Sequence, residues 1–299
     1  KVLEEYNFPI NNLILYASKR SAGKVVNFMG KDYTIVELTK DAFDGVEIAL
    51  FSAGGSVSKE YAPIAVSKGA VVVDNSSAWR MDDIYSKSNI IANPNCSTIQ
   101  SVLPLKAIND AFGIKRVVYT TYQAVSGSGQ KGVNDLVNCK NGLKPEFYPY
   151  DISKTCIPEI DEFLDDGYTK EEMKMVNETR KILHLPDLPV SATCIRVPVE
   201  NAHGVMMQVE LDKEFTIDDV KAAIKNQPGL VLYDDVKNHI YPNSLVATNN
   251  DSVYVGRIRR DISTKNGILM YCVADNIRKG AASNAVQIAM ALDIDKCKK

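Results

Sequence analysis

Short apolar runs alternate with helix-like segments along the first third of the chain. Runs that predict strands cover residues 13–18, 46–52, 70–74 and 90–92, and apolar residues at helical spacing cover 56–68 and 98–112. Strands that alternate with helices are typical of a parallel sheet with helices packed on its faces. The loops after these runs are rich in small polar residues, as at the ligand-binding edge of such sheets. The pattern therefore predicts an α/β domain with a parallel sheet.

The pattern changes after Gly113. Long runs with strand-like alternation cover 115–125, 190–199, 205–211, 252–260 and 268–274, as expected for a mixed or antiparallel sheet. Capping boxes at Thr169 and, more weakly, at Thr216 open two helices, and a last amphipathic helix covers 280–292. We therefore expect two domains. Residues 1–95 with 276–299 form the α/β domain, and 96–275 form an α+β domain with a large mixed sheet.

The predicted parallel sheet lacks its usual opening. Sheets that bind dinucleotides normally begin with a strand and a glycine-rich turn, and neither precedes the strand at 13–18. Either the fold lacks this opening, or residues of the molecule before Lys1 are omitted from this sequence.

The charge of the chain argues against several kinds of partner. Lys and Arg number 35 and Asp and Glu number 37, so the formal net charge is −2 and we expect neither nucleic acid nor an anionic membrane as a partner. No apolar run approaches the roughly 18 residues of a membrane span, and the first residues do not resemble a signal peptide. The 6 cysteines include no C-x-x-C pair and no Cys/His group typical of a metal site. We expect a cytoplasmic protein with reduced thiols and no metal.

Cys96 is the candidate nucleophile. It follows Asn93-Pro94-Asn95 at the point where a loop enters the helix predicted over 98–112. Free backbone N–H groups and the positive end of the helix dipole would face the sulfur and favour its thiolate. The alternative is a buried structural cysteine, which suits the other five.

His203 is the candidate proton acceptor for that thiol. Only three histidines occur, and His184 and His239 lie in a helix end and a polar loop. Between Arg196 and His203 the strand pattern breaks at Pro198, which would let both side chains converge on one pocket. The alternative is a surface hairpin with a solvated arginine.

Three further stretches carry polar groups at suggestive positions. The basic loop after the first strand contains Arg20, Ser21 and Lys24, which suit a ribose 2′-phosphate and favour NADP over NAD; the alternative is a basic surface loop. Residues 126–129 form a Ser-Gly-Ser-Gly turn that would let a flat ring or a phosphate approach, or that is an ordinary tight turn. Glu171 and Lys174 share a helix face, as a binding pair or a solvated ion pair.

Several of these motifs together resemble one enzyme family, the aspartate-β-semialdehyde dehydrogenases. The resemblance rests first on Asn93–Gln100 (NPNCSTIQ) and Tyr122–Gly129 (YQAVSGSG). It continues, in the family's order and over nearly the whole chain, at residues 17–24, 51–56, 74–80, 171–174, 194–203, 255–261 and 275–288. The resemblance implies a parallel Rossmann-type NADP-binding domain followed by an α+β catalytic and dimerisation domain with a large mixed sheet.

The resemblance also implies a role for each matched residue. Cys96 forms the acyl-enzyme thioester, His203 is the acid/base, and Gln123 orients the thiohemiacetal. The implied substrate contacts are Arg196 with the carboxylate, Glu171 with the amino group, Arg80 and Lys174 with phosphate, and Asn95. The implied cofactor contacts are Arg20, Ser21, Ser52, Ala53, Gly54, Ser126, Gly127 and Asn276.

The implied reaction is the NADP-dependent interconversion of aspartyl-β-phosphate and aspartate-β-semialdehyde, with inorganic phosphate. It belongs to lysine, threonine and methionine biosynthesis, with diaminopimelate on the lysine branch. The implied assembly is a homodimer or homotetramer through the second domain. Two alternatives stay open: an N-acetyl-γ-glutamyl-phosphate reductase-like enzyme, and an inactive paralogue acting as an assembly partner. The free amino group implied by Glu171 argues against the first, and the presence of Cys96, His203 and Arg196 argues against the second.

The chain departs from the family pattern at three places. The opening strand and glycine loop are absent, and the stretches at Met81–Ile84 and Asn141–Glu146 are short. Because the catalytic set is intact, we expect residues omitted from the sequence at these places.

Overall fold

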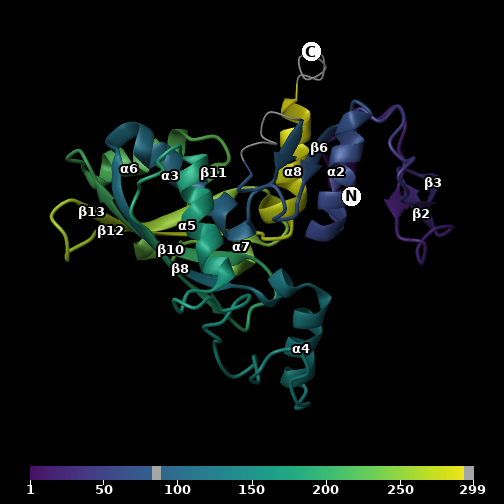
Figure 1. Cartoon of the computed structure of the whole chain (residues 1–299). Coiled ribbons are helices and arrows are strands. Elements are labelled where there is room, and N and C mark those ends of the chain that lie inside the picture. The colour runs from purple at the N-terminus through teal and green to yellow at the C-terminus, as the bar shows by residue number, and fades with distance from the viewer. Residues whose placement is uncertain (83–88, 293–299) are drawn as a thin grey trace. The chain divides into compact units, whose positions relative to one another are not determined.

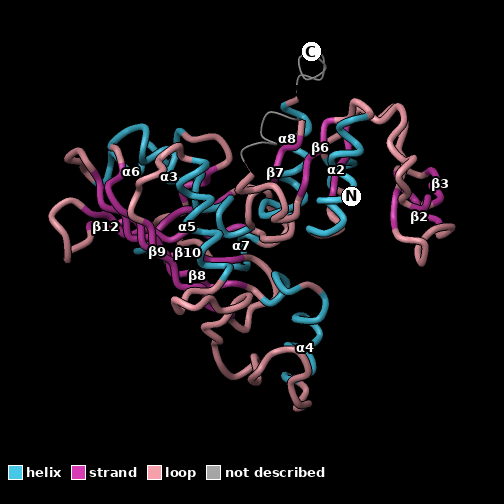
Figure 2. The backbone as a smooth tube through the Cα atoms, in the orientation of Figure 1, coloured by secondary structure: helices cyan, strands magenta, loops and turns pink. Residues whose placement is uncertain are grey.

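The computed structural model describes residues 1–82 and 89–292 and divides them between two compact units. Unit 1 contains Lys1–Pro94 and the segment from Ala282 onward, and unit 2 contains Asn95–Ala281. Figures 1 and 2 show the elements of each unit.

Unit 1 is built around a three-stranded parallel sheet. The sheet consists of β5 (Ile48–Phe51), β6 (Val71–Asp74) and β7 (Ile90–Ala92) in that order. Successive strand residues face opposite sides. Val72 packs in the cluster that contains Ala62 and Ala65 of α2 (Gly55–Ser67), whereas Val73 packs with Ala285 of α8 (Ser283–Ala291). The sheet therefore has a helix on each face, which is the α/β arrangement expected from the apolar runs.

Smaller elements complete unit 1. A parallel pair joins β1 (Tyr16–Ala17) to β4 (Val36–Glu37), and a hairpin joins β2 (Val25–Phe28) to β3 (Lys31–Thr34). The short helix α1 (Val2–Glu5) precedes them. The strand predicted over 13–18 shortens to two residues, matching the length of its partner β4. The hairpin was not predicted.

Unit 2 contains a six-stranded mixed sheet. The strand order is β11 (Leu230–Leu232), β12 (Val253–Arg260), β13 (Gly267–Ala274), β10 (His203–Leu211), β8 (Ile114–Gln123) and β9 (Val190–Arg196). Strand β10 runs antiparallel to both neighbours, while β9 runs parallel to β8 and β11 parallel to β12. The large mixed sheet expected from the second half of the sequence is therefore confirmed.

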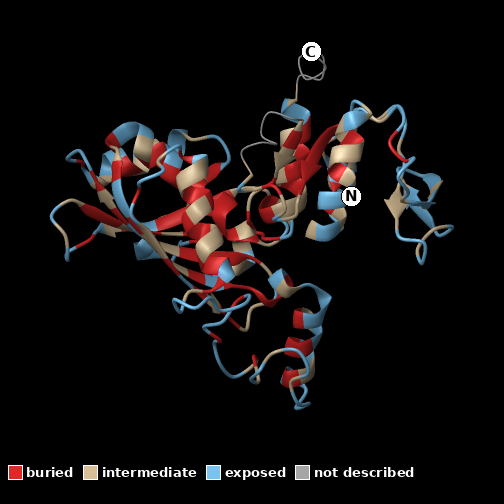
Figure 3. Cartoon of the chain, viewed as in Figure 1, coloured by how far each residue is buried: buried red, intermediate tan, exposed pale blue. Residues whose placement is uncertain are grey.

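Three helices cover one face of this sheet: α3 (Cys96–Phe112), α5 (Lys170–Ile182) and α6 (Ile217–Asn226). Val205, Met207 and Val209 alternate along β10 and are buried in the core beneath them. Figure 3 shows buried residues in many of the strands and helices of this unit. Both predicted capping boxes are present, at Thr169–Glu172 and at Thr216–Asp219.

The remaining elements follow or connect the strands of unit 2. They are η2 (Val125–Ser128), α4 (Gln130–Lys140), η3 (Val236–Asn238), α7 (Ser244–Ala247) and the π-helical turn η4 (Arg278–Ala282), which leads into α8. Of the stretches expected to be short, 141–146 follows the end of α4, where the Glu146 N–H donates to Asp135 at 2.7 Å. Residues 83 and 84 of the other stretch lie outside the described residues.

Candidate active site

Cys96 is the first residue of helix α3. Asn95 is the N-cap, and its Oδ1 accepts hydrogen bonds from the backbone N–H groups of Ser97 at 2.9 Å and Thr98 at 3.2 Å. Cys96 is partly exposed and its thiol is in no disulfide. The helix therefore begins where the sequence predicted, and the first-turn N–H groups lie beside the cysteine backbone.

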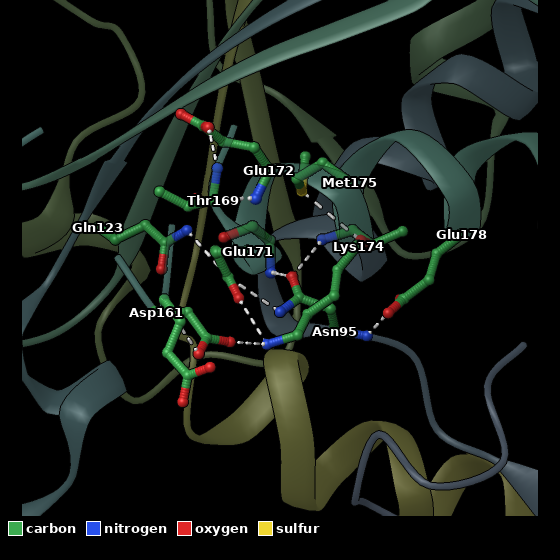
Figure 4. A network of polar contacts seen from close by, with 12 residues as sticks. Asn95, Gln123, Asp161, Thr169, Glu171, Glu172, Lys174, Met175 and Glu178 are labelled. Carbon is green, nitrogen blue, oxygen red and sulfur yellow. Dashed lines mark hydrogen bonds and ion pairs between the residues drawn. The ribbon is translucent and has the colours of Figure 1, made fainter. Parts of the chain in front are cut away.

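Helix α5 holds Asn95 with two buried carboxylates. The Asn95 backbone N–H donates to Glu178 Oε2 at 2.7 Å, and the Asn95 Nδ2 donates to Glu171 Oε1 at 3.0 Å. Figure 4 shows both contacts reaching Asn95 from the same helix. Sequence reasoning singled out Glu171 but missed Glu178, whose contact to Asn95 spans 83 positions.

Glu171 also binds two other predicted site residues. Its Oε1 accepts from Gln123 Nε2 at 3.1 Å, and its Oε2 pairs with Lys174 Nζ at 3.2 Å. Glu171 is 5% exposed. Four predicted site residues, Asn95, Gln123, Glu171 and Lys174, are therefore joined in one polar network (Figure 4).

Lys174 has a second acidic partner, which the sequence did not indicate. Its Nζ lies 2.7 Å from Asp161 Oδ2, and Asp161 has a left-handed backbone with φ of 69°. Burial alone would lower the pKa of Lys174, but the carboxylates of Glu171 and Asp161 outweigh it and raise that pKa. Lys174 therefore carries a proton and lies between two negative groups.

Arg196 and His203 both bind the main chain of Ala124. The Arg196 Nη1 donates to the Ala124 carbonyl at 2.7 Å, and the Ala124 N–H donates to His203 Nδ1 at 3.0 Å. The two side chains come from different strands, Arg196 at the end of β9 and His203 at the start of β10. The predicted break between them is present, and it brings the two groups together.

Gly127 marks the space that the two groups share. A Cβ built on Gly127 would lie 2.8 Å from Arg196 Nη1 and 3.0 Å from His203 Nε2. Arg196 Nη1 and His203 Nε2 therefore both lie within 3.0 Å of the position that a Cβ on Gly127 would occupy. Any side chain at position 127 would displace them.

Both groups are buried with unused hydrogen-bonding atoms. Among the described residues, Arg196 Nε and His203 Nε2 have no hydrogen-bond partner, and Arg196 makes no ion pair there. Arg196 is 4% exposed and His203 is 0% exposed. A buried guanidinium without an acidic partner is costly unless a ligand anion binds it.

Burial changes the expected titration of His203. Desolvation, together with the positive charge of Arg196, lowers the pKa of His203 well below its ordinary value of 6.5. Because Nδ1 accepts the Ala124 N–H, the neutral ring carries its proton on Nε2. The ring is therefore neutral near pH 7, since it is fully buried beside a cation.

Asn276 connects the glycine-rich turn to the beginning of β10. Its Nδ2 donates to Ser126 Oγ at 3.0 Å, and its Oδ1 accepts the Ala202 N–H at 2.9 Å. Ala202 has a φ of 70° and precedes His203. Three predicted cofactor residues, Ser126, Gly127 and Asn276, therefore lie in unit 2, in the same neighbourhood as His203.

Gly280 packs directly against the candidate nucleophile. A Cβ on Gly280 would lie 2.8 Å from the Cβ of Cys96. The absence of a side chain at Gly280 therefore permits this close packing.

The other predicted residues lie in unit 1. Arg80 bridges the carboxyl ends of two strands of the parallel sheet, because its Nε donates to the Asn93 carbonyl at 2.9 Å and its Nη2 to the Asn75 carbonyl at 3.0 Å. The remaining five are Arg20 and Ser21 in the turn after β1, and Ser52, Ala53 and Gly54 between β5 and α2. Arg20, Ser52, Ala53 and Gly54 are exposed.

The described residues contain neither a candidate metal site nor a candidate membrane-spanning helix. Within residues 1–82 and 89–292, no cluster of three or more His, Cys, Asp or Glu side chains could hold a metal ion. In the same part of the chain no helix is long and apolar enough to cross a membrane.

Comparison with known proteins gives two family matches. The family model "Semialdehyde dehydrogenase, NAD binding domain" matches residues 1–122, and "Semialdehyde dehydrogenase, dimerisation domain" matches residues 105–279. The chain is 51% identical to the aspartate-semialdehyde dehydrogenase of Aquifex aeolicus, covering 98% of this chain and 93% of the relative. It is 46% identical to the Bacillus subtilis enzyme of the same name, covering 98% and 92%.

The chain belongs to the aspartate-semialdehyde dehydrogenase family. A similar solved structure is aspartate semialdehyde dehydrogenase II from Vibrio cholerae, also determined in complex with ASA, with 43% identity, a TM-score of 0.91, and coverage of 97% of this chain and 92% of that one. The family membership makes the chain an oxidoreductase with a nicotinamide-cofactor domain and a dimerisation domain. The aligned span of 315 positions with the Aquifex relative exceeds the 299 residues of this chain, so the relative has residues without counterparts here.

Proposed function

We propose that this chain uses NADP to interconvert aspartyl-β-phosphate and aspartate-β-semialdehyde through a thioester on Cys96, within lysine, threonine and methionine biosynthesis. The observation that carries this proposal is the buried Arg196 guanidinium, which makes no ion pair within the described residues and lies beside the unsatisfied Nε2 of His203. A substrate with a carboxylate and a reacting carbonyl would satisfy both groups.

Cys96 acts as the nucleophile in this proposal. Its thiolate attacks the carbonyl carbon of the acyl phosphate, the carbon–sulfur bond forms, and the carbon–oxygen bond to phosphate breaks to release inorganic phosphate. When bound, NADPH would supply a hydride to the thioester carbon. The carbonyl oxygen would take up a proton, and the carbon–sulfur bond would then break to release the aldehyde and return Cys96 to its thiol. The start of α3 at Cys96 supports the thiolate because the helix dipole is positive there.

His203 donates a hydrogen bond from Nε2 to the reacting oxygen. The hydrogen bond from Ala124 to Nδ1 fixes this tautomer and the ring orientation. A neutral imidazole whose pKa is lowered can polarise a carbonyl without carrying a full charge. Gln123, whose Nε2 is bound to Glu171, supports the orientation of the sulfur-bound intermediate.

Substrate recognition is assigned to polar groups of unit 2 and to Arg80 of unit 1. Arg196 binds the α-carboxylate, and Glu171, whose negative charge suits an ammonium group, binds the amino group. Asn95 orients the substrate beside the nucleophile. Phosphate is assigned to Lys174 and Arg80, and binding at Lys174 requires Asp161 to release its ion pair.

The residues of unit 1 fit a phosphorylated dinucleotide. Gly54 is the N-cap of α2 with a φ of 94° and no side-chain cap, so a ligand phosphate can reach the first-turn N–H groups. The exposed Arg20, with Ser21, suits the 2′-phosphate that distinguishes NADP from NAD. Ser52 and Ala53 belong to the same cofactor loop, and Ser126, Gly127 and Asn276 are the cofactor residues assigned in unit 2.

We assign the dimer to the open face of the six-stranded sheet. Tyr122 on β8 is 39% exposed there, and its ring lies 6.3 Å from that of Tyr271 on β13. Aromatic side chains are enriched at protein–protein interfaces relative to the rest of the surface. The five free cysteines among the described residues support a reducing, cytoplasmic location.

The direct test follows NADPH absorbance with aspartate semialdehyde, inorganic phosphate and NADP. We expect turnover that requires phosphate and that is lost in Cys96→Ala. N-acetyl-glutamate semialdehyde should be a poor substrate because its acylated amine cannot pair with Glu171. Equal or better turnover of that aldehyde would favour the reductase alternative, and no turnover of either would favour the inactive paralogue.

A further inference from the structure

Glu178 is a buried acid that the proposed chemistry does not use. It lies near the C-terminal end of α5 and is 3% exposed. Buried carboxylates are rare unless they are bound by other groups, because losing water is costly for a charge. Its Oε2 accepts the Asn95 backbone N–H at 2.7 Å, a short charge-assisted hydrogen bond.

The N–H of Asn95 has no acceptor within its own helix. Asn95 is the N-cap of α3, and N–H groups at this end precede the first intrahelical hydrogen bond. Asn95 is 6% exposed, so solvent water has little access to hydrogen-bond with its N–H group. The preceding residue is Pro94, which brings no N–H of its own. Glu178 therefore accepts a hydrogen bond from a buried N–H group in the Pro94–Asn95 peptide bond. Asn95 is the residue directly before Cys96.

The spacing along α5 places this contact on a helix face that packs against the beginning of α3. Glu171, Met175 and Glu178 are i, i+4 and i+7, so they share one side of the helix. Each touches the beginning of α3: Glu171 the Asn95 side chain, Met175 the hydroxyl of Thr98 at 3.5 Å, and Glu178 the Asn95 backbone. Two carboxylates therefore fix Asn95 at its side chain and at its main chain.

Fixing Asn95 also fixes Cys96. The peptide plane between Asn95 and Cys96 places the backbone nitrogen of Cys96, and the helical φ of this first residue of α3 then sets the direction of its Cα–Cβ bond. On the other side Gly280 leaves no room, since a Cβ there would approach the Cβ of Cys96 to 2.8 Å. A small movement of the Asn95 backbone would therefore redirect the thiol.

We propose that Glu178 is a positioning residue, which orients the Asn95–Cys96 segment for attack by accepting the Asn95 N–H. The inference rests on the proposed function, in which Cys96 is the nucleophile. Glu178 touches neither substrate nor cofactor in this assignment.

The test compares three substitutions of Glu178. Glu178→Ala removes the acceptor, Glu178→Gln keeps an oxygen at the same length, and Glu178→Asp keeps the charge but shortens the side chain by one methylene. Because a displacement of 1 Å can cost about 100-fold in rate, we expect Glu178→Ala to lower kcat by about 10- to 100-fold with KM values within about 2-fold. Glu178→Gln should recover most of kcat, and Glu178→Asp should not.

Glu172 provides the matched control. It lies on the same helix, is 7% exposed, and accepts two backbone N–H groups, from Thr169 at 2.7 Å and from Cys194 at 2.9 Å. Neither donor belongs to the nucleophile segment. Glu172→Ala should therefore lower the melting temperature, while folded protein keeps the wild-type kcat.

A second measurement does not depend on activity. Amide hydrogen exchange, followed by mass spectrometry over a peptide that begins at or before Ile91 and therefore retains the Asn95 N–H, should be faster in Glu178→Ala than in wild type. It should return to the wild-type rate in Glu178→Gln. In Glu172→Ala this peptide should be unchanged.

The proposal is overturned if Glu178→Ala keeps kcat, if Glu172→Ala lowers kcat equally, or if Glu178→Gln is as impaired as Glu178→Ala. If Glu178→Ala does not fold, the Gln and Asp variants decide, and an active Asp variant beside an inactive Gln variant would contradict the role of the acceptor. Failure of the proposed function is distinguishable, because wild-type protein would then lack phosphate-dependent turnover or Cys96→Ala would retain it.

Discussion

The backbone N–H of Ala124 donates to His203 Nδ1 at 3.0 Å, and this contact decides which nitrogen of His203 faces the site. The ring is fully buried, and Nε2 points to the space beside Gly127, with Arg196 as its neighbour. His203 is therefore held as a neutral hydrogen-bond donor. The consequence is a specific dependence of stability on pH.

Replacing His203 should reveal that dependence. The pKa of His203 is lowered in the native protein, so above about 6.5 both the native and the unfolded states are neutral at this ring and no difference arises. Below about 6.5 the unfolded chain binds a proton that the native ring refuses, so stability is lost as the pH falls towards the native pKa. The loss approaches about 1.4 kcal/mol per pH unit.

The measurement is urea unfolding of wild type and His203→Gln at pH 7.5 and at pH 5. The free energy of unfolding of wild type should fall relative to that of the variant at the lower pH, because Gln does not titrate. A constant difference between the two proteins would show that His203 is not buried as a neutral ring.

Gly127→Ala should damage catalysis more than folding. Its methyl group would lie 2.8 Å from Arg196 Nη1 and 3.0 Å from His203 Nε2, so both groups must move. We expect kcat/KM to fall by at least about 10-fold, since small displacements at a reacting centre are costly. Steady-state kinetics measure this.

Gly142→Ala is the control for Gly127→Ala. Gly142 has a φ of 80° and no atom within 4 Å of an added Cβ, so its substitution strains the backbone without touching the site. This variant should lose stability and keep its activity. Equal kinetics for the two variants would contradict the role of the space beside Gly127.

Asp161→Asn should improve phosphate binding. Asp161 pairs with Lys174 at 2.7 Å, and phosphate must replace that partner if Lys174 binds it. Removing the competing charge should lower the KM for phosphate severalfold, while the KM for the semialdehyde changes less. Initial rates measured as a function of phosphate concentration give the phosphate KM of each protein. A higher phosphate KM in Asp161→Asn would contradict the prediction and would mean that Asp161 holds Lys174 in place for binding.

Arg20→Ala should weaken NADP more than NAD. The 2′-phosphate is the charged difference between the two cofactors, and a contact to a charged group contributes about 1.5–3 kcal/mol, so the ratio of KM values should shift by at least about 10-fold. Lys40→Ala, another exposed cation of unit 1, is the control. A ratio unchanged by Arg20→Ala would place the selectivity for the 2′-phosphate elsewhere.

Local signals predicted much of the fold and part of the site. The apolar runs predicted β5, β6 and β7, and Asn95 with its following residues predicted the start of α3, because strands and helix caps are set by neighbouring residues. The hairpin β2–β3 was missed, since Met29, at a φ of 50°, is not a residue that turns usually select.

Contacts between residues far apart in the chain could not be predicted from the sequence alone. The hydrogen bond from Asn95 to Glu178 spans 83 positions and that from Ala124 to His203 spans 79, and no local pattern encodes either. The lowered pKa of His203 follows from burial next to Arg196, which is known only once the chain is folded. The pairing of Asp161 with Lys174 depends on a loop conformation that composition does not predict.

The measurement that tests the central claim most directly is a trap of the thioester. Wild-type protein mixed with aspartate semialdehyde and NADP, without phosphate, should accumulate an aspartyl group on the peptide that contains Cys96, detected by mass spectrometry after acid quench. Adding phosphate should discharge it, and Cys96→Ala should neither form it nor turn over. An acyl group on another residue, or phosphate-dependent turnover by Cys96→Ala, would contradict the account.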